Sequence, residues 1–379
     1  MSRTQYYTVL KDVKLIKKPF HVARAVAAKY FLAIKPKTVI GVTGSVGKTT
    51  TTKAVAAALG TSAISTLENL DSVFNIPITV LKSSKLKFLV LEMGVQYPGD
   101  MVFNTSIAPV DIAVFTRISP AHIQYLDSVD GIFAEKSKII SARTKLVIYN
   151  ADDKILNERF KNLNIPKLSY GASADSDFRI EIGKETLKQT ELSIVYKGES
   201  YKINTNLIGR HQSYSIAAAF AVAHHLGFDI KTIIDNLKNL RPADNRFNIT
   251  KAGKADVIKD IYNSSPQALA DAIDFVGRQK YTNKIIYLGD MLELGLISEK
   301  EHLTIAAQLL KSDFNQIYTF GPESQKIHNY LKKHNSKAKI EHLFKPKKID
   351  KISYPSSTII LVKGSHGMHM ENFFTGKRV

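Results

Sequence analysis

The sequence predicts an α/β protein with two successive units, each built on a mostly parallel sheet. Apolar, β-branched runs alternate with helical patterns from residue 38 onward, which is typical of strands separated by crossover helices. The alternation breaks near residues 240–244 and then resumes. A glycine-containing loop also stands between the first apolar run and the first helical pattern, as at a phosphate-binding turn.

The alternation predicts individual elements in chain order. For the first unit we expect helices at 127–141 and 213–226 and strands at 38–42, 87–91, 111–116 and 145–149, with short β runs at 178–180 and 192–196. For the second unit we expect helices at 266–276 and 298–311 and strands at 257–260, 284–288, 316–320 and 358–362. The predicted divisions are an extension at 1–37, a central P-loop ATPase domain at 38–242 and a smaller Rossmann-like domain at 243–379.

The extension is basic and then alanine-rich. Lys11, Lys14, Lys17 and Lys18 precede a helical stretch that reaches Ile34. We expect this helix to pack on the next domain through an apolar face made of Phe20, Ala23, Ala27, Tyr30, Phe31 and Ile34. The alternative is a basic helix that lies on a membrane surface, with association through residues 11–34.

Composition excludes several classes of protein. The 379 residues contain no cysteine, which removes disulfides and thiolate metal sites and fits a cytoplasmic location. No apolar run approaches the roughly 20 residues that span a bilayer. The net charge of +19 comes from 53 Lys and Arg against 34 Asp and Glu, spread along the chain without a nucleic-acid-binding module. We expect a monomer that acts on small anionic molecules and not on nucleic acid.

The phosphate-binding turn is Thr43-Gly44-Ser45-Val46-Gly47-Lys48-Thr49-Thr50. Its glycines let a phosphate approach the backbone N–H groups at a helix N-terminus. Lys48 is suited to the outer phosphates and Thr49 to Mg²⁺. Val42 departs from the generic pattern, which places Gly or Ala there, but the strand–turn–helix context predicts a nucleoside triphosphate site. Glu92 ends a neighbouring strand, where a carboxylate is placed to bind the same Mg²⁺.

Further motifs extend the pattern along the chain. They are Glu92-Met93-Gly94, Ala121-His122 with Lys136 fourteen residues later, Asn150-Ala151-Asp152-Asp153, Gly209-Arg210-His211, Asn245-Arg246, Asp260-Ile261-Tyr262-Asn263-Ser264-Ser265-Pro266, Gly289-Asp290-Met291-Leu292-Glu293-Leu294-Gly295 and Val362-Lys363-Gly364-Ser365. In this order and spacing the chain resembles the ATP-dependent Mur ligases over about residues 38–375.

The resemblance implies an amide ligase of defined mechanism. An acid's carboxylate attacks the γ-phosphate of ATP, giving an acyl phosphate and ADP, and an incoming amine then displaces phosphate. It implies two Mg²⁺ sites, with Thr49 and Glu92 at the first, His122 at the second and a lysine carbamylated by CO₂ at Lys136. In the second unit it implies nucleotide contacts from Arg246, Asp260, Tyr262 and Asn263, Arg246 reaching the γ-phosphate when the domains close. Lys363 and Ser365, assisted by Asp290 and Glu293, are candidates for holding the amine substrate. The alternative for Asp290 and Glu293 is a role in a helix cap or turn.

The chain departs from the family on the acid-substrate side. Mur ligases carry a UDP-sugar-binding domain before the phosphate loop, whereas 37 residues precede the first strand here, so we expect that domain to be absent. The acid-substrate loop of the family corresponds to Asn69, Asp71, Ser72 and Asn75, and the family's His-Asn pair becomes His211-Gln212. The leading hypothesis is a ligase that adds an amino acid or dipeptide to a cell-wall precursor or related acid. Two alternatives remain: a ligase for another acid, as in polyglutamate or cofactor synthesis, and a nucleotide-binding subunit that needs a partner chain.

Overall fold

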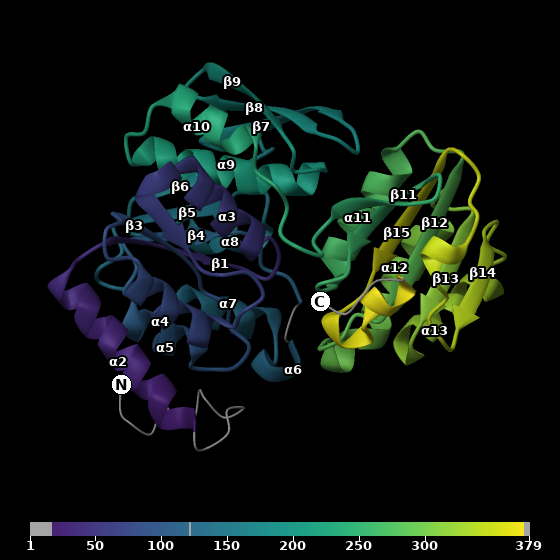
Figure 1. Cartoon of the computed structure of the whole chain (residues 1–379), viewed down its shortest axis with the longest axis horizontal. Coiled ribbons are helices and arrows are strands. Elements are labelled where there is room, and N and C mark those ends of the chain that lie inside the picture. The colour runs from purple at the N-terminus through teal and green to yellow at the C-terminus, as the bar shows by residue number, and fades with distance from the viewer. Residues whose placement is uncertain (1–16, 121–122, 375–379) are drawn as a thin grey trace. The chain divides into compact units, whose positions relative to one another are not determined.

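The computed structural model describes residues 17–120 and 123–374, which divide into two compact units. The first comprises residues 1–118 and 125–241, and the second comprises 119–124 and 242–379. Each unit contains one sheet, and both are drawn in Figure 1. The predicted α/β class, with a large mostly parallel sheet followed by a smaller sheet domain, is confirmed.

The first unit is organised around a nine-stranded sheet in the order β2-β3-β1-β4-β5-β6-β7-β8-β9. The strands from β2 to β7 are parallel, and β8 and β9 continue as an antiparallel meander. The strands are β1 (Thr38–Thr43), β2 (Ala63–Ser65), β3 (Phe88–Glu92), β4 (Ile112–Phe115), β5 (Leu146–Asn150), β6 (Lys167–Gly171), β7 (Phe178–Glu185), β8 (Thr190–Tyr196) and β9 (Glu199–Thr205).

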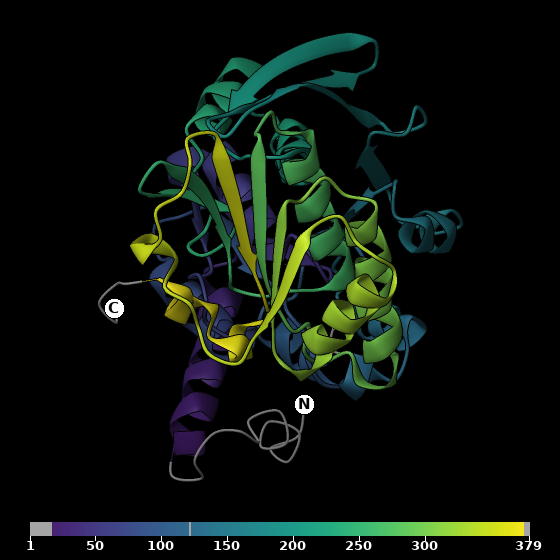
Figure 2. The same cartoon turned by 90° about the vertical axis from the view of Figure 1, so that its right-hand side faces the viewer.

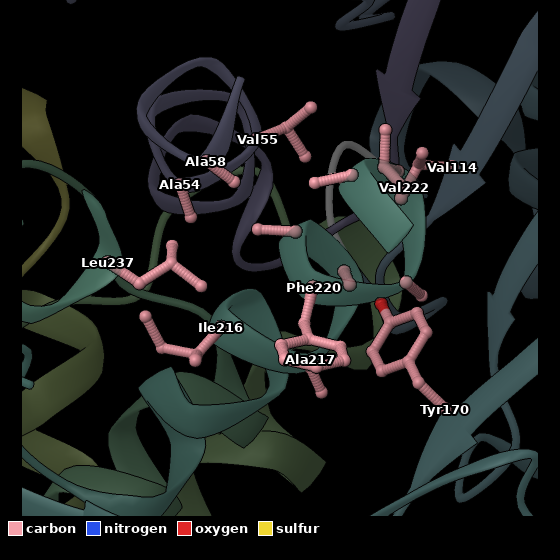
Figure 3. Packing of buried hydrophobic residues seen from close by; sticks show 14 of the residues in the cluster. Ala54, Val55, Ala58, Val114, Tyr170, Ile216, Ala217, Phe220, Val222 and Leu237 are labelled. Carbon is pink, nitrogen blue, oxygen red and sulfur yellow. The ribbon is translucent and has the colours of Figure 1, made fainter. Parts of the chain in front are cut away.

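Helices cover both faces of this sheet because its central strands are apolar on both sides. On one face, α3 and α9 pack through alanines such as Ala54 and Ala217, and Phe220 and Leu237 fill the space around them (Figure 3). Small side chains let two helices approach each other and the sheet closely. The helices before residue 242 are α2 (Lys18–Ile34), α3 (Lys48–Ala58), α4 (Ser72–Lys82), α5 (Asp100–Ile107), α6 (Ile123–Leu126), α7 (Val129–Ser137), α8 (Lys154–Phe160), α9 (Arg210–His225) and α10 (Ile230–Lys238).

The second unit has a six-stranded sheet in the order β10-β11-β15-β12-β13-β14, antiparallel only between β10 and β11. Figure 2 shows its helices gathered on one face, while the chain's last turns lie on the other, where Met370 and Phe373 pack against Tyr287. The elements are β10 (Asn248–Ala252), β11 (Ala255–Asp260), α11 (Pro266–Arg278), β12 (Asn283–Gly289), α12 (Ser298–Leu310), β13 (Gln316–Phe320), α13 (Pro322–Lys333), β14 (Lys339–Leu343) and β15 (Thr358–Lys363).

Helix α2 forms where the sequence predicts a helix, but its predicted packing face is wrong. It packs on α4 and α5 through Ala25, Ala28 and Leu32, which are buried. Phe20, Tyr30 and Ile34 are instead exposed. Small alanines on the inner side allow close helix packing, and this preference outweighs the larger apolar area of the opposite side. None of the helices formed by residues 17–120 and 123–374 is both long enough and apolar enough to cross a membrane.

Candidate active site

The phosphate loop joins the carboxyl end of β1 to the first residue of α3. Gly44 and Gly47 have positive φ values of 147° and 87°, which non-glycine residues rarely adopt. A Cβ on Gly44 would lie 1.9 Å from Thr116 Oγ1, so a side chain there collides with the neighbouring strand end. The backbone N–H of Ser45 donates to the carbonyl of Arg117 at 2.6 Å, which ties the loop to the residues after β4.

Two threonine hydroxyls hold the loop from neighbouring strand ends. Thr116 Oγ1 donates to the carbonyl of Val46 at 2.7 Å. Thr43 Oγ1 donates to the carbonyl of Met93 at 2.9 Å, which links β1 to the segment after β3. The sequence placed Thr116 at a strand end without giving it a role, because a tertiary hydrogen bond over 70 residues has no local signal. The loop is thus preorganised by the two strands that flank β1.

The N-terminus of α3 supplies the positive end of the site. The helix begins at Lys48 after Gly47, and no side chain caps its first turn. Such a terminus leaves backbone N–H groups and the positive end of the helix dipole directed at one small volume, which suits a phosphate. The amine of Lys48 lies 3.3 Å from the carbonyl of Ser45, folded back over the loop.

Thr49 and Glu92 form the pair that the sequence predicts as Mg²⁺ ligands. Thr49 Oγ1 donates to Glu92 Oε2 at 2.7 Å. Glu92 reaches this place because β3 lies beside β1, with Glu92 in register with Val42. A hydroxyl and a carboxylate oxygen are hard donors of the kind Mg²⁺ selects, and Mg²⁺ is usually held by one or two carboxylates together with substrate phosphates. No cluster of three or more His, Cys, Asp or Glu side chains occurs within residues 17–120 and 123–374, in keeping with so sparse a donor set.

Lys136 lies behind the loop on α7 and is only 2% exposed. Its amine donates to the carbonyl of Gly44 at 2.9 Å. Burial lowers the pKa of Lys136 well below its usual value, and the nearby ammonium of Lys48 lowers that pKa further. The carboxylates of Glu92, Glu135 and Asp100 oppose this shift without cancelling it. The predicted partner of Lys136 on the second metal, His122, lies outside the described residues.

Glu135 and Asp100 are buried acids near Lys136 that the sequence analysis missed. Glu135 Oε1 accepts the backbone N–H groups of Gly99 and Met101 at 2.9 and 3.1 Å, at the start of α5. Asp100 accepts the N–H groups of Gln96 and Tyr97, while burial raises its pKa. Their neighbours in sequence give no hint of this, since a Glu beside a Lys on a helix is usually solvated. The two acids therefore position the chain after Gly94 beside Lys136.

Four of the five residues predicted for the acid substrate lie around the start of α4 in the sequence, and the fifth, His211, lies on α9. Asp71 caps this helix by accepting from the N–H of Val73 at 3.0 Å, and Ser72 Oγ accepts from the N–H of Gly94 at 2.8 Å. The Asn75 amide bonds both backbone groups of Leu67. The other predicted residues are Asn69, in a left-handed turn with φ 59°, and His211, in the first turn of α9.

In the second unit the predicted residues gather at the carboxyl ends of β11, β12 and β15. Lys363 is 1% exposed and its amine lies 2.5 Å from Asp260 Oδ2 and 3.0 Å from the carbonyl of Asn263. Ser365 Oγ donates to the carbonyl of Ser264 at 3.3 Å. Asp260 and Lys363 face each other because they are register partners on β11 and β15.

The remaining predicted residues of this unit either shape turns of the chain or make a cation–π contact. Both carboxylate oxygens of Asp290 accept backbone N–H groups at the start of α13, from Glu323 at 3.3 Å and Ser324 at 2.6 Å. Glu293 occupies a left-handed turn with φ 63°. The guanidinium of Arg246 lies 4.0 Å from the ring centroid of Tyr262, a cation–π contact that orders both side chains.

A parallel sheet with a glycine loop, a threonine–carboxylate pair and a helix N-terminus at one strand edge defines a P-loop nucleotide-binding domain. Two family descriptions match the chain: Mur ligase middle domain over residues 42–223, and Mur ligase, glutamate ligase domain over residues 245–366. The chain belongs to the Mur ligase family. It is an ATP-dependent ligase that forms amide bonds.

Comparison with individual proteins shows which members of the family the chain resembles. The chain is 29% identical over 354 residues to the UDP-N-acetylmuramoyl-tripeptide–D-alanyl-D-alanine ligase of Bacillus subtilis, covering 91% of this chain and 76% of that one. It is 26% identical to the enzyme of the same name from Rickettsia prowazekii, covering 88% and 76%. The crystal structure of MurF ligase from Thermotoga maritima in complex with ADP matches with a TM-score of 0.81 at 25% identity, covering 93% and 82%. The enzyme is therefore MurF-like.

Proposed function

We propose that this enzyme joins D-alanyl-D-alanine to the peptide carboxylate of a muramoyl tripeptide, in the synthesis of a peptidoglycan precursor. The names of the relatives in Bacillus and Rickettsia support this substrate pair. The observation that carries the chemistry is the Thr49–Glu92 pair at the phosphate loop, with the buried Lys136 behind it. The acid carboxylate attacks the γ-phosphorus, ADP leaves, and the dipeptide amine then attacks the acyl carbon and displaces phosphate.

The residues of the phosphate loop take separate roles in this proposal. The N–H groups from Gly44 to Thr50 bind the β-phosphate, and Lys48 holds the oxygens of the phosphoryl group that is transferred. Thr49 and Glu92 would hold a first Mg²⁺, which would supply neutralisation of phosphate charge. His122 and Lys136 belong to a second Mg²⁺ site.

We infer that Lys136 is carbamylated in the active enzyme. Addition of CO₂ to an amine requires the neutral form, and burial favours that form at Lys136 by lowering its pKa. The reaction joins the nitrogen to the carbon of CO₂ and releases one proton, so the side chain becomes an anion. A buried anion next to Lys48 and a metal ion is better compensated than a buried ammonium in the same place.

Within the second unit, Arg246, Asp260, Tyr262 and Asn263 are proposed nucleotide contacts, and Lys363, Ser365, Asp290 and Glu293 are proposed amine-substrate residues. The Asp260–Lys363 pair supports a preformed surface at the strand ends, because each side chain fixes the other. Since both oxygens of Asp290 accept backbone N–H groups, its contribution is to position the turn before α13.

On the acid side, Asn69, Asp71, Ser72, Asn75 and His211 are the proposed contacts. The hydrogen bond between Ser72 and Gly94 supports this, because it brings the start of α4 to the segment that follows Glu92. We further propose that residues 38–242 and 243–379 are the two catalytic domains, following the extension at 1–37. The enzyme acts as a monomer in the cytoplasm, where its ATP is available.

The proposed function is tested by ADP release and product mass. Purified enzyme with ATP and Mg²⁺ is given UDP-N-acetylmuramoyl-tripeptide, D-alanyl-D-alanine, both, or neither. We expect ADP formation with both and a product whose mass equals the two substrates minus water. The assignment would be overturned if ADP formed but none of the mixtures gave a ligated product. It would also be overturned if the enzyme ligated a single amino acid in preference to the dipeptide. The Lys48→Ala variant controls for contaminating ATPases.

A further inference from the structure

Helix α2 has a second apolar side that no described part of the chain covers. Phe20, Ala23, Ala27, Tyr30 and Ile34 recur three or four residues apart and so form one stripe along the helix. Phe20 and Tyr30 are each 66% exposed and Ile34 is 77% exposed. Figure 1 shows α2 on the outer side of α4 and α5. By helical spacing, the stripe lies on the side of α2 opposite its buried residues. A helix that is apolar on two sides is expected to have both sides covered, either by its own chain or by a binding partner.

Cations border this stripe along one edge. By helical geometry Arg24 and Lys35 lie along one edge of the stripe, whereas Lys18 and Lys29 lie nearer the buried side of the helix. Arg24 lies over the ring of Phe20 at 5.5 Å, so its charge is held beside the apolar surface. No Asp or Glu occurs anywhere between residues 13 and 67.

The positive charge continues past the end of the helix. A hollow after Pro36 is lined by four cationic side chains, Lys37, Lys87, Arg143 and Lys145, and by one carboxylate, Asp111. That carboxylate is already paired with Arg143 at 3.1 Å. The surface around α2 is therefore complementary to a broad anionic partner.

We propose that the stripe on α2 binds the surface of an anionic lipid membrane, with the helix lying in the interfacial plane. Apolar side chains enter the boundary between headgroups and acyl chains, Tyr30 keeps its hydroxyl at headgroup level, and the bordering cations meet lipid phosphates. A second copy of the chain fits this surface poorly, because an antiparallel symmetric pair of α2 helices places the edges that carry Arg24 and Lys35 against each other, and each copy has a net charge of +19. The enzyme would thereby make its precursor at the membrane.

A single tryptophan tests the contact directly. The chain contains no tryptophan, so Tyr30→Trp places one indole in the stripe, and Phe344→Trp, at a residue 82% exposed in the second unit, is the matched control. With vesicles of phosphatidylcholine and phosphatidylglycerol we expect the emission of Tyr30→Trp, and not of Phe344→Trp, to move to shorter wavelength. Equal shifts at both positions, or none at Tyr30→Trp, would overturn the proposal.

Cosedimentation of the full chain with the same vesicles separates the apolar and charged contributions. We expect Ile34→Asp to weaken binding at least about tenfold, and Lys35→Glu about fivefold or more, since a surface cation contributes on the order of 1 kcal/mol. Phe344→Asp and Lys231→Glu change apolarity and charge equally at exposed sites elsewhere and are expected to bind as wild type. Equal binding to neutral vesicles would contradict the role of charge. A dimer in light scattering that Ile34→Asp dissociates, without vesicle binding, would replace the membrane with a second copy.

Discussion

Thr49 Oγ1 donates a hydrogen bond of 2.7 Å to Glu92 Oε2 across two parallel strands, although 43 residues separate them in the chain. The pair exists because β3 lies directly beside β1 and ends at the same edge. Oxygen donors from a loop and from a neighbouring strand thus meet where the N-terminus of α3 attracts phosphate. This relationship makes the phosphate loop a candidate catalytic site and not only a turn.

Lys48→Ala is expected to lower ADP formation at least about 100-fold, because Lys48 is the only cationic residue within the loop segment 43–50 and stabilises the transferred phosphoryl group. Initial rates with saturating substrates measure the effect. Lys231→Ala, at an exposed position on α10, controls for the loss of one surface charge. Turnover above a few per cent of wild type in Lys48→Ala would refute the phosphate-loop assignment.

Glu92→Gln is expected to raise the Mg²⁺ concentration for half-maximal activity roughly tenfold, since an amide is a poorer metal ligand than a carboxylate. The hydrogen bond from Thr49 survives this change, so folding is preserved. A Mg²⁺ titration of the rate measures the effect, with Glu158→Gln on the exposed side of α8 as the control. An unchanged titration curve would leave Glu92 with a structural role only.

Activity is expected to fall when CO₂ is removed and to return with bicarbonate, because Lys136 must react as its neutral amine. The direction of its pKa shift sets the pH dependence: lowering the pKa increases the neutral fraction at neutral pH, and raising the pH increases it further. The rate of reactivation by bicarbonate is the measurement.

Lys136→Ala is expected to be inactive and partly rescued by small carboxylates that occupy the vacated anion position. Full activity in a sample whose intact mass shows an unmodified Lys136 would contradict carbamylation. Activity and mass are measured on the same preparation, because the adduct is labile.

Thr116→Val is expected to raise the KM for ATP about fivefold. The substitution removes the hydrogen bond to Val46, and losing one such bond destabilises the binding conformation of the loop by on the order of 1 kcal/mol. Thr116→Ser keeps the hydroxyl and is expected to remain close to wild type. Steady-state kinetics of both variants decide the point, and equal KM values would show that the loop holds its shape without this bond.

Asp260→Asn is expected to destabilise the second unit by about 2 kcal/mol, because it leaves the buried amine of Lys363 without its carboxylate. Lys363→Met removes the buried charge itself and is expected to cost less. Urea unfolding of both variants measures the difference. A larger loss in Lys363→Met would mean that packing, and not the ion pair, makes Lys363 important.

Local patterns determined most of the elements and the nucleotide chemistry. The strand–loop–helix around Lys48 was readable because its glycine spacing and apolar strand are adjacent in sequence. The class of fold and the ligase family followed from the alternation of strands and helices and from the order of the motifs. Because these signals lie in contiguous stretches of sequence, they can be recognised without knowing how the elements pack.

Tertiary structure alone decided which side chains meet. It placed Glu135 and Asp100 near Lys136, joined Thr116 to the loop, and paired Asp260 with Lys363. It also reversed the predicted face of α2, since an apolar stripe on a helix does not say whether another helix or a different partner will cover it. Burial and contacts between residues distant in sequence depend on how strands are ordered in the sheet, and that order is not written in any single stretch of the chain.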